Sequence, residues 1–515
     1  MTREIELKFL LDAATEARLR AADPLRHAEC QRLSDQTLHA IYLDTDARAL
    51  AALGVALRLR KEGRRWVQAV KAGTGVVAGL SSPRESECAA PGGRLDLAAI
   101  PDADLRALVT QTVGDTPLAP VCETVIRRSR RILKGPHGGS VELAIDVGEI
   151  RAGGRAEPIR EAELELKSGD PRDLYAVARA LFTEGPLRFS RRTKAARGHA
   201  LAQGRPAVEA VPAPILAAPV ALKPSQTTES AAASVLRGCL DQIAGNAAAA
   251  ALGDAPEGPH QLRVGLRRLR TAVAVFGPVI DCPALAALAA EAQALAATVG
   301  AVRDLDVLAQ ELVAPMADAD PGFKPLAAAL ESRAQAARAA ARARLAAPQT
   351  VALILDLGAF VEARGWLRPA DFDQTAELAQ PVIRTAQKAL DRRWRKAAHL
   401  GAQIDSLEGE ARHDLRKALK KLRYAIEFFE SLWPKRKVRP FLTRLKTLQD
   451  DFGAMQDVLT AETLLLGPDA PAARDPAAQR AVGRLLGAGE AESARRWARA
   501  RDDWAALAQA KHFWA

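Results

Sequence analysis

The chain has 515 residues, which exceeds one hydrophobic core and predicts at least two domains. Its net charge of +11 favours an anionic partner, and its 48% hydrophobic content excludes a disordered chain. Aromatic residues make up only 4%, which disfavours nucleic acid as a partner. No uninterrupted apolar run is long enough to cross a bilayer, and the N-terminus is charged where a signal peptide is apolar. We therefore expect a cytoplasmic globular protein without a membrane partner.

The first residues alternate between charged and apolar types. In a strand, Glu4, Glu6 and Lys8 share one face and the apolar residues between them share the other. A solvated edge strand has the same pattern, but later segments repeat it. Further strands are predicted at residues 39–45, 56–60, 66–71, 84–87, 123–133, 141–147 and 161–167. Short turns between them predict a closed antiparallel barrel.

Carboxylates and cations recur at a period of two along these strands. Burying such groups alone is prohibitive, whereas mutual pairing, water and a bound metal make it tolerable. Clustered carboxylates suit Mg²⁺ or Mn²⁺, and facing Arg and Lys side chains suit phosphate oxygens. The two sets in one cavity predict a site for a metal-bound phosphate chain.

The Glu4-x-Glu6-x-Lys8 opening, Arg58-x-Arg60, Lys71 and the closing Glu161-x-Glu163-x-Glu165 resemble the CYTH family, the triphosphate tunnel metalloenzymes. The resemblance implies an eight-stranded antiparallel β tunnel with flanking helices over residues 1–204, which hydrolyses or cyclises triphosphate compounds with Mg²⁺ or Mn²⁺. By position it implies catalytic residues Glu4, Glu6, Lys8 and Lys71; substrate-binding residues Arg58, Arg60, Arg128 and Lys194; and metal-binding residues Glu4, Glu6, Asp146, Glu161, Glu163 and Glu165. Arg128 is chosen from the run 127–131, in which Arg127 and Arg130 stay open as alternatives.

A Pro- and Ala-rich stretch at residues 205–222 predicts a semi-rigid, extended linker. Beyond it, strand patterns give way to long Ala-, Leu- and Arg-rich segments with helical spacing. Residues 223–515 are therefore expected to form an all-α helical-bundle domain.

The helical half contains an internal repeat. A basic motif that begins at His260 recurs at His413, an offset of 153 residues (413 − 260), and the same offset relates Phe276 to Phe429. One basic helix face is ordinarily a solvated surface, but two faces at a fixed offset, each led by a histidine, favour an anion site. The residues expected to bind the anion are His260, Arg263, Arg267, Arg270, His413, Arg416, Lys417, Lys420 and Arg423.

This half resembles the CHAD domain, the conserved-histidine α-helical domain, and the resemblance implies that it binds inorganic polyphosphate. The leading hypothesis is a metal-dependent inorganic triphosphatase that converts tripolyphosphate to pyrophosphate and phosphate and holds polyphosphate, in the cytoplasm or at polyphosphate granules. One alternative is a nucleotide or thiamine triphosphatase or an adenylate cyclase. Another is a non-enzymatic polyphosphate binder that targets granules.

Overall fold

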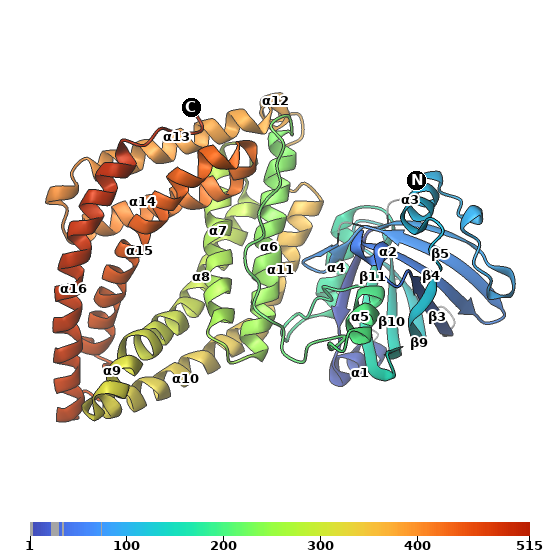
Figure 1. Cartoon of the computed structure of the whole chain (residues 1–515), viewed down its shortest axis with the longest axis horizontal. Coiled ribbons are helices and arrows are strands. Elements are labelled where there is room, and N and C mark those ends of the chain that lie inside the picture. The colour runs from blue at the N-terminus through green and yellow to red at the C-terminus, as the bar shows by residue number, and fades with distance from the viewer. Residues whose placement is uncertain (1–3, 22–29, 33–34, 74) are drawn as a thin grey trace. The chain divides into compact units, whose positions relative to one another are not determined.

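The computed structural model of the chain describes residues 4–21, 30–32, 35–73 and 75–515. It divides into two compact units. The first comprises Met1–Ala213 with Ala346–Ala363, and the second comprises Pro214–Leu345 with Arg364–Ala515. The first unit holds the β-sheet and the second is built from helices (Figure 1), so the predicted α+β architecture is confirmed. The domain borders at residues 204 and 222 stay predictions.

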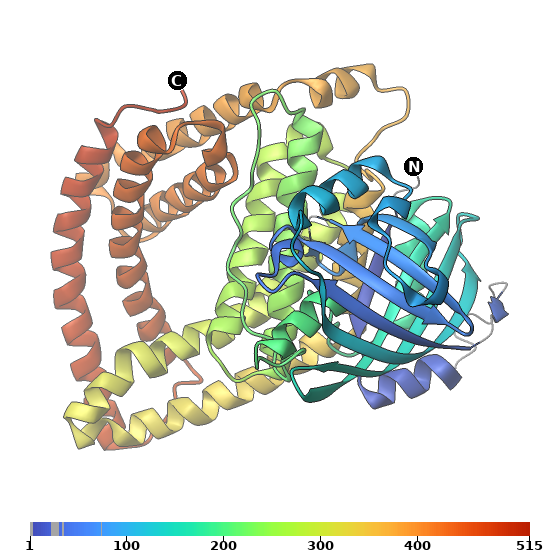
Figure 2. The same cartoon turned by 45° about the vertical axis from the view of Figure 1, so that its right-hand side comes forward.

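The first unit is organised around one antiparallel sheet. Its strands are β1 (Glu6–Leu10), β2 (Cys30–Arg32), β3 (Gln36–Asp44), β4 (Val55–Glu62), β5 (Arg65–Ala72), β6 (Val76–Val77), β7 (Leu80–Ser81), β8 (Arg84–Ala89), β9 (Ala119–Lys134), β10 (Ser140–Ala152) and β11 (Arg155–Ser168). Their order is β6-β7-β1-β11-β10-β9-β3-β4-β5-β8, with β2 beside β9. The eight longer strands match the expected number, and β2, β6 and β7 are short additions. The sheet is strongly curled (Figure 2), but the end strands β6 and β8 form no ladder with each other within the described residues, so the expected closure is absent there.

Helices pack around the curled sheet. They are α1 (Ala13–Ala21), α2 (Ala49–Ala52), α3 (Ala103–Val113), α4 (Pro171–Leu181), α5 (Lys194–Ala202) and α11 (Pro348–Glu362), with short 3₁₀ turns at Pro91–Gly93 and Leu97–Ala99. Helices α2 and α3 cover the outer face, whereas α5 borders the cavity on the inner side. Leu57 and Val70 of the sheet pack with Val109 of α3 in one buried cluster. Since successive strand residues point to opposite faces, burying the apolar set under the helices turns the charged set inward.

Helix α11 belongs to the first unit although its sequence lies far along the chain. It packs against α4, where Gly358 lies directly beside the Tyr175 ring. Arg179 of α4 forms an ion pair of 2.5 Å with Asp356 of α11. Sequence analysis did not predict this assignment.

The second unit is a duplicated helical domain. Its elements are α6 (Thr228–Leu252), α7 (Glu257–Ile280), α8 (Pro283–Asp306), the π-helix Val307–Val313, α9 (Ala314–Ala319), α10 (Lys324–Ala346), α12 (Phe372–Ala379), α13 (Val382–Gly401), α14 (Gly409–Phe429), α15 (Lys435–Leu466) and α16 (Pro476–Ala508), with 3₁₀ turns at Pro321–Phe323, Ile404–Ser406 and Glu430–Leu432. Helices α6, α7, α8 and α10 recur as α13, α14, α15 and α16, close to the offset seen in the sequence.

The two repeats meet through equivalent positions. The rings of Phe276 and Phe429, which the offset relates, lie 5.8 Å apart. At the starts of α6 and α13 the hydrogen bonds are reciprocal: Thr228 N donates to Gln380 O, and Val382 N donates to Gln226 O, each at 2.8 Å. Reciprocal contacts of this kind mark a pseudo-two-fold axis, so α7 and α14 face each other across it.

The predicted linker is anchored to the second unit at three points. Asn246 accepts a hydrogen bond from Ile215 N and donates one to Ile215 O, each at 2.9 Å. Ser431 Oγ accepts from Leu222 N and donates to Val220 O, also at 2.9 Å. The stretch lacks helix and strand, as expected, but from Ile215 onward it is fixed by side chains.

One helical segment, Pro283–Ala319, is long and apolar enough by length and composition to span a membrane, with a mean hydropathy of 1.5 over its most apolar window. The sequence argument had found no uninterrupted run, because Glu291 interrupts this one. Leu295 and Val299 of the segment are buried, but only 33% of that window is buried within the protein. The absence of a membrane partner stays a prediction.

Candidate functional site

The inner face of the curled sheet encloses a cavity of about 830 Å³. Its charged lining residues come from seven strands and from the start of α5. They are Glu4, Glu6, Lys8, Arg58, Arg60, Lys71, Glu85, Glu87, Arg128, Arg130, Glu142, Glu163, Glu165, Lys167, Arg191, Arg192 and Lys194. A cavity lined this densely by both signs of charge suits a ligand that itself carries both, such as a metal-bound polyanion.

Strand register explains why these side chains meet. Lys8 on β1 lies opposite Glu163 on β11, and Glu6 lies opposite Glu165. Directly opposed residues of an antiparallel pair project to the same face, so the alternation on one strand continues across its neighbours. The motif of the first strand and the closing Glu161–Glu165 motif therefore form one charged surface.

The deeper end of this surface holds three buried carboxylates. Ligand atoms of Asp146, Glu161 and Glu163 all lie within 4.8 Å of one another. Lys194 Nζ contacts all three, at 2.7 Å from Asp146 and 3.0 Å from Glu163, with Glu161 as the third partner. Arg128 donates two hydrogen bonds to Asp146 and one to Glu163, each at 2.7 Å. Each of these carboxylates is thus matched by a cation.

Electrostatics keep Asp146, Glu163 and Lys194 ionised. Burial alone would raise the pKa of Asp146, but Lys194 and Arg128 outweigh it and hold that pKa below its usual value. Burial opposes the charge of Glu163 in the same way, and Lys194 and Lys8 hold its pKa well below normal. The same carboxylates raise the pKa of Lys194 well above normal, against the effect of burial. The network is charged at neutral pH.

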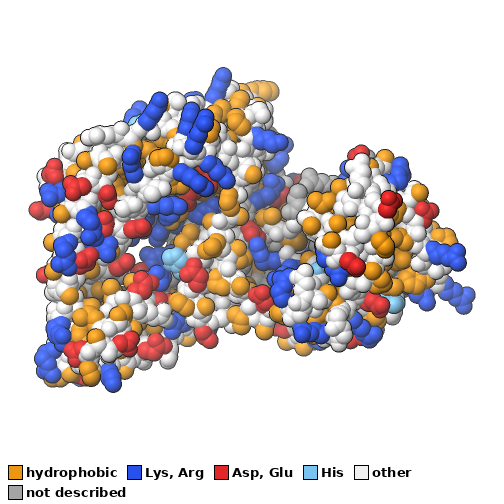
Figure 3. All heavy atoms as spheres, viewed as in Figure 1, with side chains coloured by type: hydrophobic (Ala, Val, Ile, Leu, Met, Phe, Trp, Pro, Cys, Tyr) orange, Lys and Arg blue, Asp and Glu red, His pale blue; other side chains and the backbone are white. Residues whose placement is uncertain are grey.

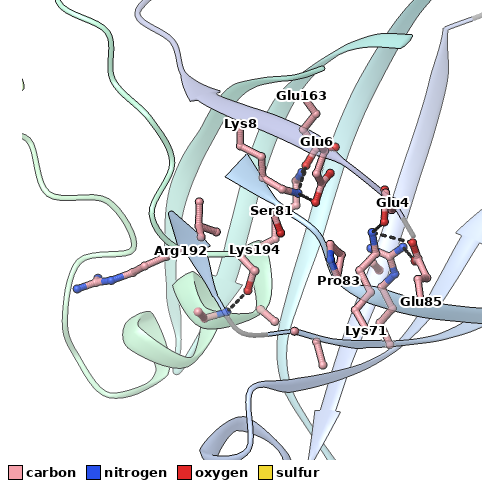
Figure 4. A pocket seen from close by; sticks show the side chains of 18 of the residues that line it. Glu4, Glu6, Lys8, Lys71, Ser81, Pro83, Glu85, Glu163, Arg192 and Lys194 are labelled. Atoms are coloured by element: carbon pink, nitrogen blue, oxygen red, sulfur yellow. Dashed lines mark hydrogen bonds and ion pairs between the residues drawn. The ribbon is translucent and has the colours of Figure 1, made fainter. Parts of the chain in front are cut away.

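A second group of charged side chains includes Glu4, Lys71 and Glu85, which lie together in Figure 4. Lys71 Nζ lies 3.0 Å from Glu4 and 2.8 Å from Glu85, and Arg58 lies 3.2 Å from Glu85. Burial raises the pKa of Glu4 to about 7; Lys71 opposes this rise, and neighbouring Glu6 and Glu85 add to it. Burial also acts on Glu85, but Lys71 and Arg58 lower its pKa to about 2. Near neutral pH, Glu4 therefore exchanges readily between its protonated and ionised forms, chiefly because it is buried.

These donors fit a hard divalent cation. A cation between Glu4 and Glu6 would offset the burial that chiefly raises the pKa of Glu4 and the repulsion by Glu6 that adds to it. Carboxylate oxygens are the ligands that such ions prefer. At the deeper cluster a metal would have to displace the ammonium of Lys194 from the same oxygens. The acidic cluster is present; the ligand set and the kind of ion stay predictions.

The structure places most of the residues predicted for this domain at the cavity wall. Asp146 and Glu161 are buried behind it, 0% and 1% exposed, and act on the cavity through Lys194 and Arg128. Within the arginine run, Arg128 and Arg130 both face inward, whereas Arg127 points outward to Asp35 at 2.9 Å.

Several charged residues at or behind the cavity wall were not predicted as site residues; besides those described next, Glu142, Lys167, Arg191 and Arg192 line the cavity. Arg197 of α5 is 1% exposed and pairs with Glu161. Glu85 and Glu87 line the cavity from β8. The alternation at residues 84–87 signals the two carboxylates, but no local pattern in the sequence reveals that a helix supplies Arg197.

In the helical domain, the basic stripes of α7 and α14 converge. Burial, followed by the charges of Arg267 and Arg263, lowers the pKa of Arg416 to about 10. Burial, followed by Arg267 and Arg416, lowers the pKa of Lys420 to about 6. We call Arg263, Arg267, Arg416 and Lys420 the inner basic cluster. Arg263 pairs with Asp304 at 2.6 Å, but the basic groups still disfavour one another's positive charge, and a bound anion would relieve this.

The remaining stripe residues lie elsewhere. Arg270 and Lys417 are exposed, and Arg423 pairs with Glu427 at 3.0 Å. His413 Nδ1 is 2.8 Å from Gln456 Oε1, whereas burial and nearby Arg303 lower the pKa of His260. In the parts of the chain that the structure describes, neither histidine belongs to a cluster of three metal-ligating groups.

Fold and site define a protein with a charged β cavity followed by a pseudo-two-fold helical domain with a basic cluster. Residues 2–199 match the CYTH domain, and residues 234–466 match the CHAD domain. The chain is a CYTH domain followed by a CHAD domain, which confirms both resemblances.

Two known proteins are similar to parts of the chain. An inorganic triphosphatase of Haemophilus influenzae is 30% identical over 204 residues, which are 39% of this chain. The match spans 55% of that relative's length. The crystal structure of the CHAD domain from the plant Ricinus communis is 31% identical, with a TM-score of 0.50, and covers 58% of this chain and 99% of that one.

Proposed function

We propose that the chain is a metal-dependent inorganic triphosphatase whose helical domain holds polyphosphate. The observation that carries the proposal is the cavity, in which carboxylates and cations from seven strands share one surface. Similarity of the first domain to an inorganic triphosphatase supports the reaction class. The Mg²⁺ or Mn²⁺ requirement and the cytoplasmic location are part of the proposal.

Binding would proceed by exchange of ionic partners. In the free protein, Arg58 and Lys71 pair with Glu85 and Glu4. When a metal-bound triphosphate enters, these cations would turn to phosphate oxygens and the carboxylates would turn to the metal. Charge stays balanced at each stage, so the buried site avoids an uncompensated ion.

The protein's own groups would position the chain for hydrolysis. Arg58, Arg60 and Lys8 would neutralise and align the phosphates, and Arg128 would be held in place by Asp146 and Glu163. When bound, a divalent cation would supply polarisation of the phosphoryl oxygen and activation of water.

The lining favours an inorganic substrate over a nucleotide. Among the described lining residues the one Phe, Tyr or Trp side chain is Tyr42. A base-binding pocket ordinarily offers aromatic rings for stacking, and this lining has few of them beside many charged groups.

The decisive experiment is phosphate release by the full chain after chelation, with tripolyphosphate, ATP or long-chain polyphosphate as substrate. We expect tripolyphosphate to be hydrolysed with Mg²⁺ or Mn²⁺ added back and not with EDTA. Faster turnover of ATP than of tripolyphosphate would show that the preferred substrate is a nucleotide. Undiminished activity in EDTA would contradict the metal requirement. If none of the substrates is hydrolysed, the alternative of a non-enzymatic polyphosphate-binding protein is favoured.

A further inference from the structure

Helix α13 carries a concentration of cations that its counterpart in the other repeat lacks. Helix α6 has one Lys or Arg, whereas α13 has six: Arg384, Lys388, Arg392, Arg393, Arg395 and Lys396. Most of α6 is buried in the domain, whereas Arg392, Arg395 and Lys396 are exposed. Figure 3 shows Lys and Arg side chains gathered over α13 and α14. Comparison with α6, its counterpart in the other repeat, thus shows that the cationic surface is particular to α13.

These cations join others on the neighbouring helices. The pKa of Lys421 on α14 is lowered by partial burial and then by Lys396, Arg270 and Arg393. Lys417, one turn before Lys421, contributes to the same lowering. We call Arg270, Arg393, Lys396, Lys417 and Lys421 the outer basic surface, which spans α7, α13 and α14.

The outer basic surface has few internal counterions. Lys417 pairs with Asp414 at 3.1 Å, and the charge of Lys396 also acts on Asp414. Within the described ranges, Arg270, Arg393, Lys396 and Lys421 form no ion pair of 4 Å or less. On α16, by contrast, Arg496 and Arg499 both contact Asp451. Arg393, half-buried beside Arg392, has its pKa lowered to about 10 by burial and by that neighbour. Unpaired, mutually repelling cations are typical of a surface that neutralises an external anion.

The outer basic surface adjoins the inner basic cluster. Arg270 lies one turn beyond Arg267 on α7, and Lys421 follows Lys420 on α14. A flexible anionic chain leaving the inner cluster meets the outer cations next.

We propose that the outer basic surface binds the part of a long polyphosphate chain that extends beyond the inner basic cluster, so that α13 gives the helical domain a preference for long chains. The inference rests on the proposed polyphosphate binding and adds the determinant of chain length. Short chains would be held by the inner cluster alone.

The test compares three double variants of the full chain that each remove two positive charges. The outer variant is Lys396→Gln with Lys421→Gln, the inner variant is Arg267→Gln with Arg416→Gln, and the control is Arg495→Gln with Arg499→Gln on α16. Binding of a short oligophosphate and of long-chain polyphosphate is measured in EDTA over a range of salt concentrations. Thermal unfolding of each variant confirms that the helical domain is folded.

We expect the outer variant to lose about tenfold in affinity for the long chain with less than about twofold change for the short one, because only the long chain reaches it. Its salt dependence on the long chain should fall by roughly 1.5 in the slope of log K against log salt, from two lost contacts. If the outer variant behaves like the α16 control while the inner variant loses binding, the inference about the outer basic surface is wrong, but the proposed polyphosphate binding still stands. If the inner variant also binds normally, the proposal that the basic stripes of α7 and α14 bind polyphosphate is wrong.

Discussion

Glu4 and Glu6 open the charged face of the first strand, and burial raises the pKa of Glu4, so the two carboxylates are the sharpest test of the metal site. Glu4→Gln or Glu6→Gln keeps the shape of the side chain but removes the charge that a cation needs. We expect tripolyphosphate hydrolysis to fall on the order of 100-fold, with an unchanged unfolding temperature. The measurement is phosphate release at saturating Mg²⁺ or Mn²⁺.

Glu149→Gln is the matched control, because this glutamate lies on the outer face of β10 and pairs with Arg151. It should retain normal activity. Near-normal turnover of both cavity variants at high metal concentration would remove Glu4 and Glu6 from the metal site.

Lys420 makes anion binding depend on pH. With its pKa at about 6, the amine is neutral at physiological pH while the inner basic cluster is empty. Bound polyphosphate favours the ammonium, so binding takes up a proton, and affinity should rise as the pH falls from about 8 to about 6. Titration calorimetry in two buffers of different ionisation enthalpy counts that proton.

The stability of the free helical domain should follow the opposite trend. The unfolded lysine keeps its proton up to about pH 10, so the unfolded state binds more protons above pH 6 and stability rises with pH. Asp457, whose pKa burial raises, and Asp304, paired with Arg263, also face this cluster. Lys420→Gln should lose the proton uptake, and Lys417→Gln, an exposed site, should keep it. Uptake that survives Lys420→Gln assigns the proton to another group.

Helix α5 delivers Lys194 and Arg197 to the buried carboxylates, and its seating depends on Gly198. A Cβ at this position would lie 2.0 Å from Cys122 Sγ on β9. Gly198→Ala should therefore push the helix away from β9, destabilise the domain by about 1–3 kcal/mol and reduce hydrolysis as Lys194 shifts. Chemical denaturation and phosphate release measure the two effects.

Removing the obstacle offers a direct control. Cys122→Ala with Gly198→Ala frees the space that the new methyl group requires, so activity and stability should largely return. A double variant as impaired as Gly198→Ala alone would show that helix seating is not the cause.

At the scale of the whole molecule, α11 completes the first unit from a distant part of the chain. Its sequence is apolar on all sides, and residues such as Leu353, Leu355 and Leu357 are buried. A fragment ending at residue 213 should therefore unfold about 5 °C below the first unit of the full chain and bind an apolar dye. Attaching residues 346–363 through a flexible Gly/Ser linker should restore it, and an equally stable bare fragment would contradict the role of α11.

Strand alternation was sufficient to predict which face of the sheet is charged, because a period of two fixes side-chain direction once the apolar face is buried. It therefore placed Glu6, Lys8 and Arg58 at the cavity. It did not predict that Lys194 would bind three carboxylates, since that depends on how a helix packs on the sheet. The helical repeat was visible as a fixed offset, but the place of α11 was not, because long-range packing leaves no local pattern.

The pseudo-two-fold contact between Phe276 and Phe429 bears on how the helical domain diverged. In a symmetric dimer of a single repeat, every substitution occurs in both copies, so the two copies cannot acquire different residues at equivalent positions. Joining the copies in one chain removes that coupling. One copy of the first helix is then free to stay buried as α6 while the other becomes the cationic α13, and His260 meets Arg303 where His413 meets Gln456. Because both repeats lie in one chain, the equivalent surfaces of α6 and α13 can change independently.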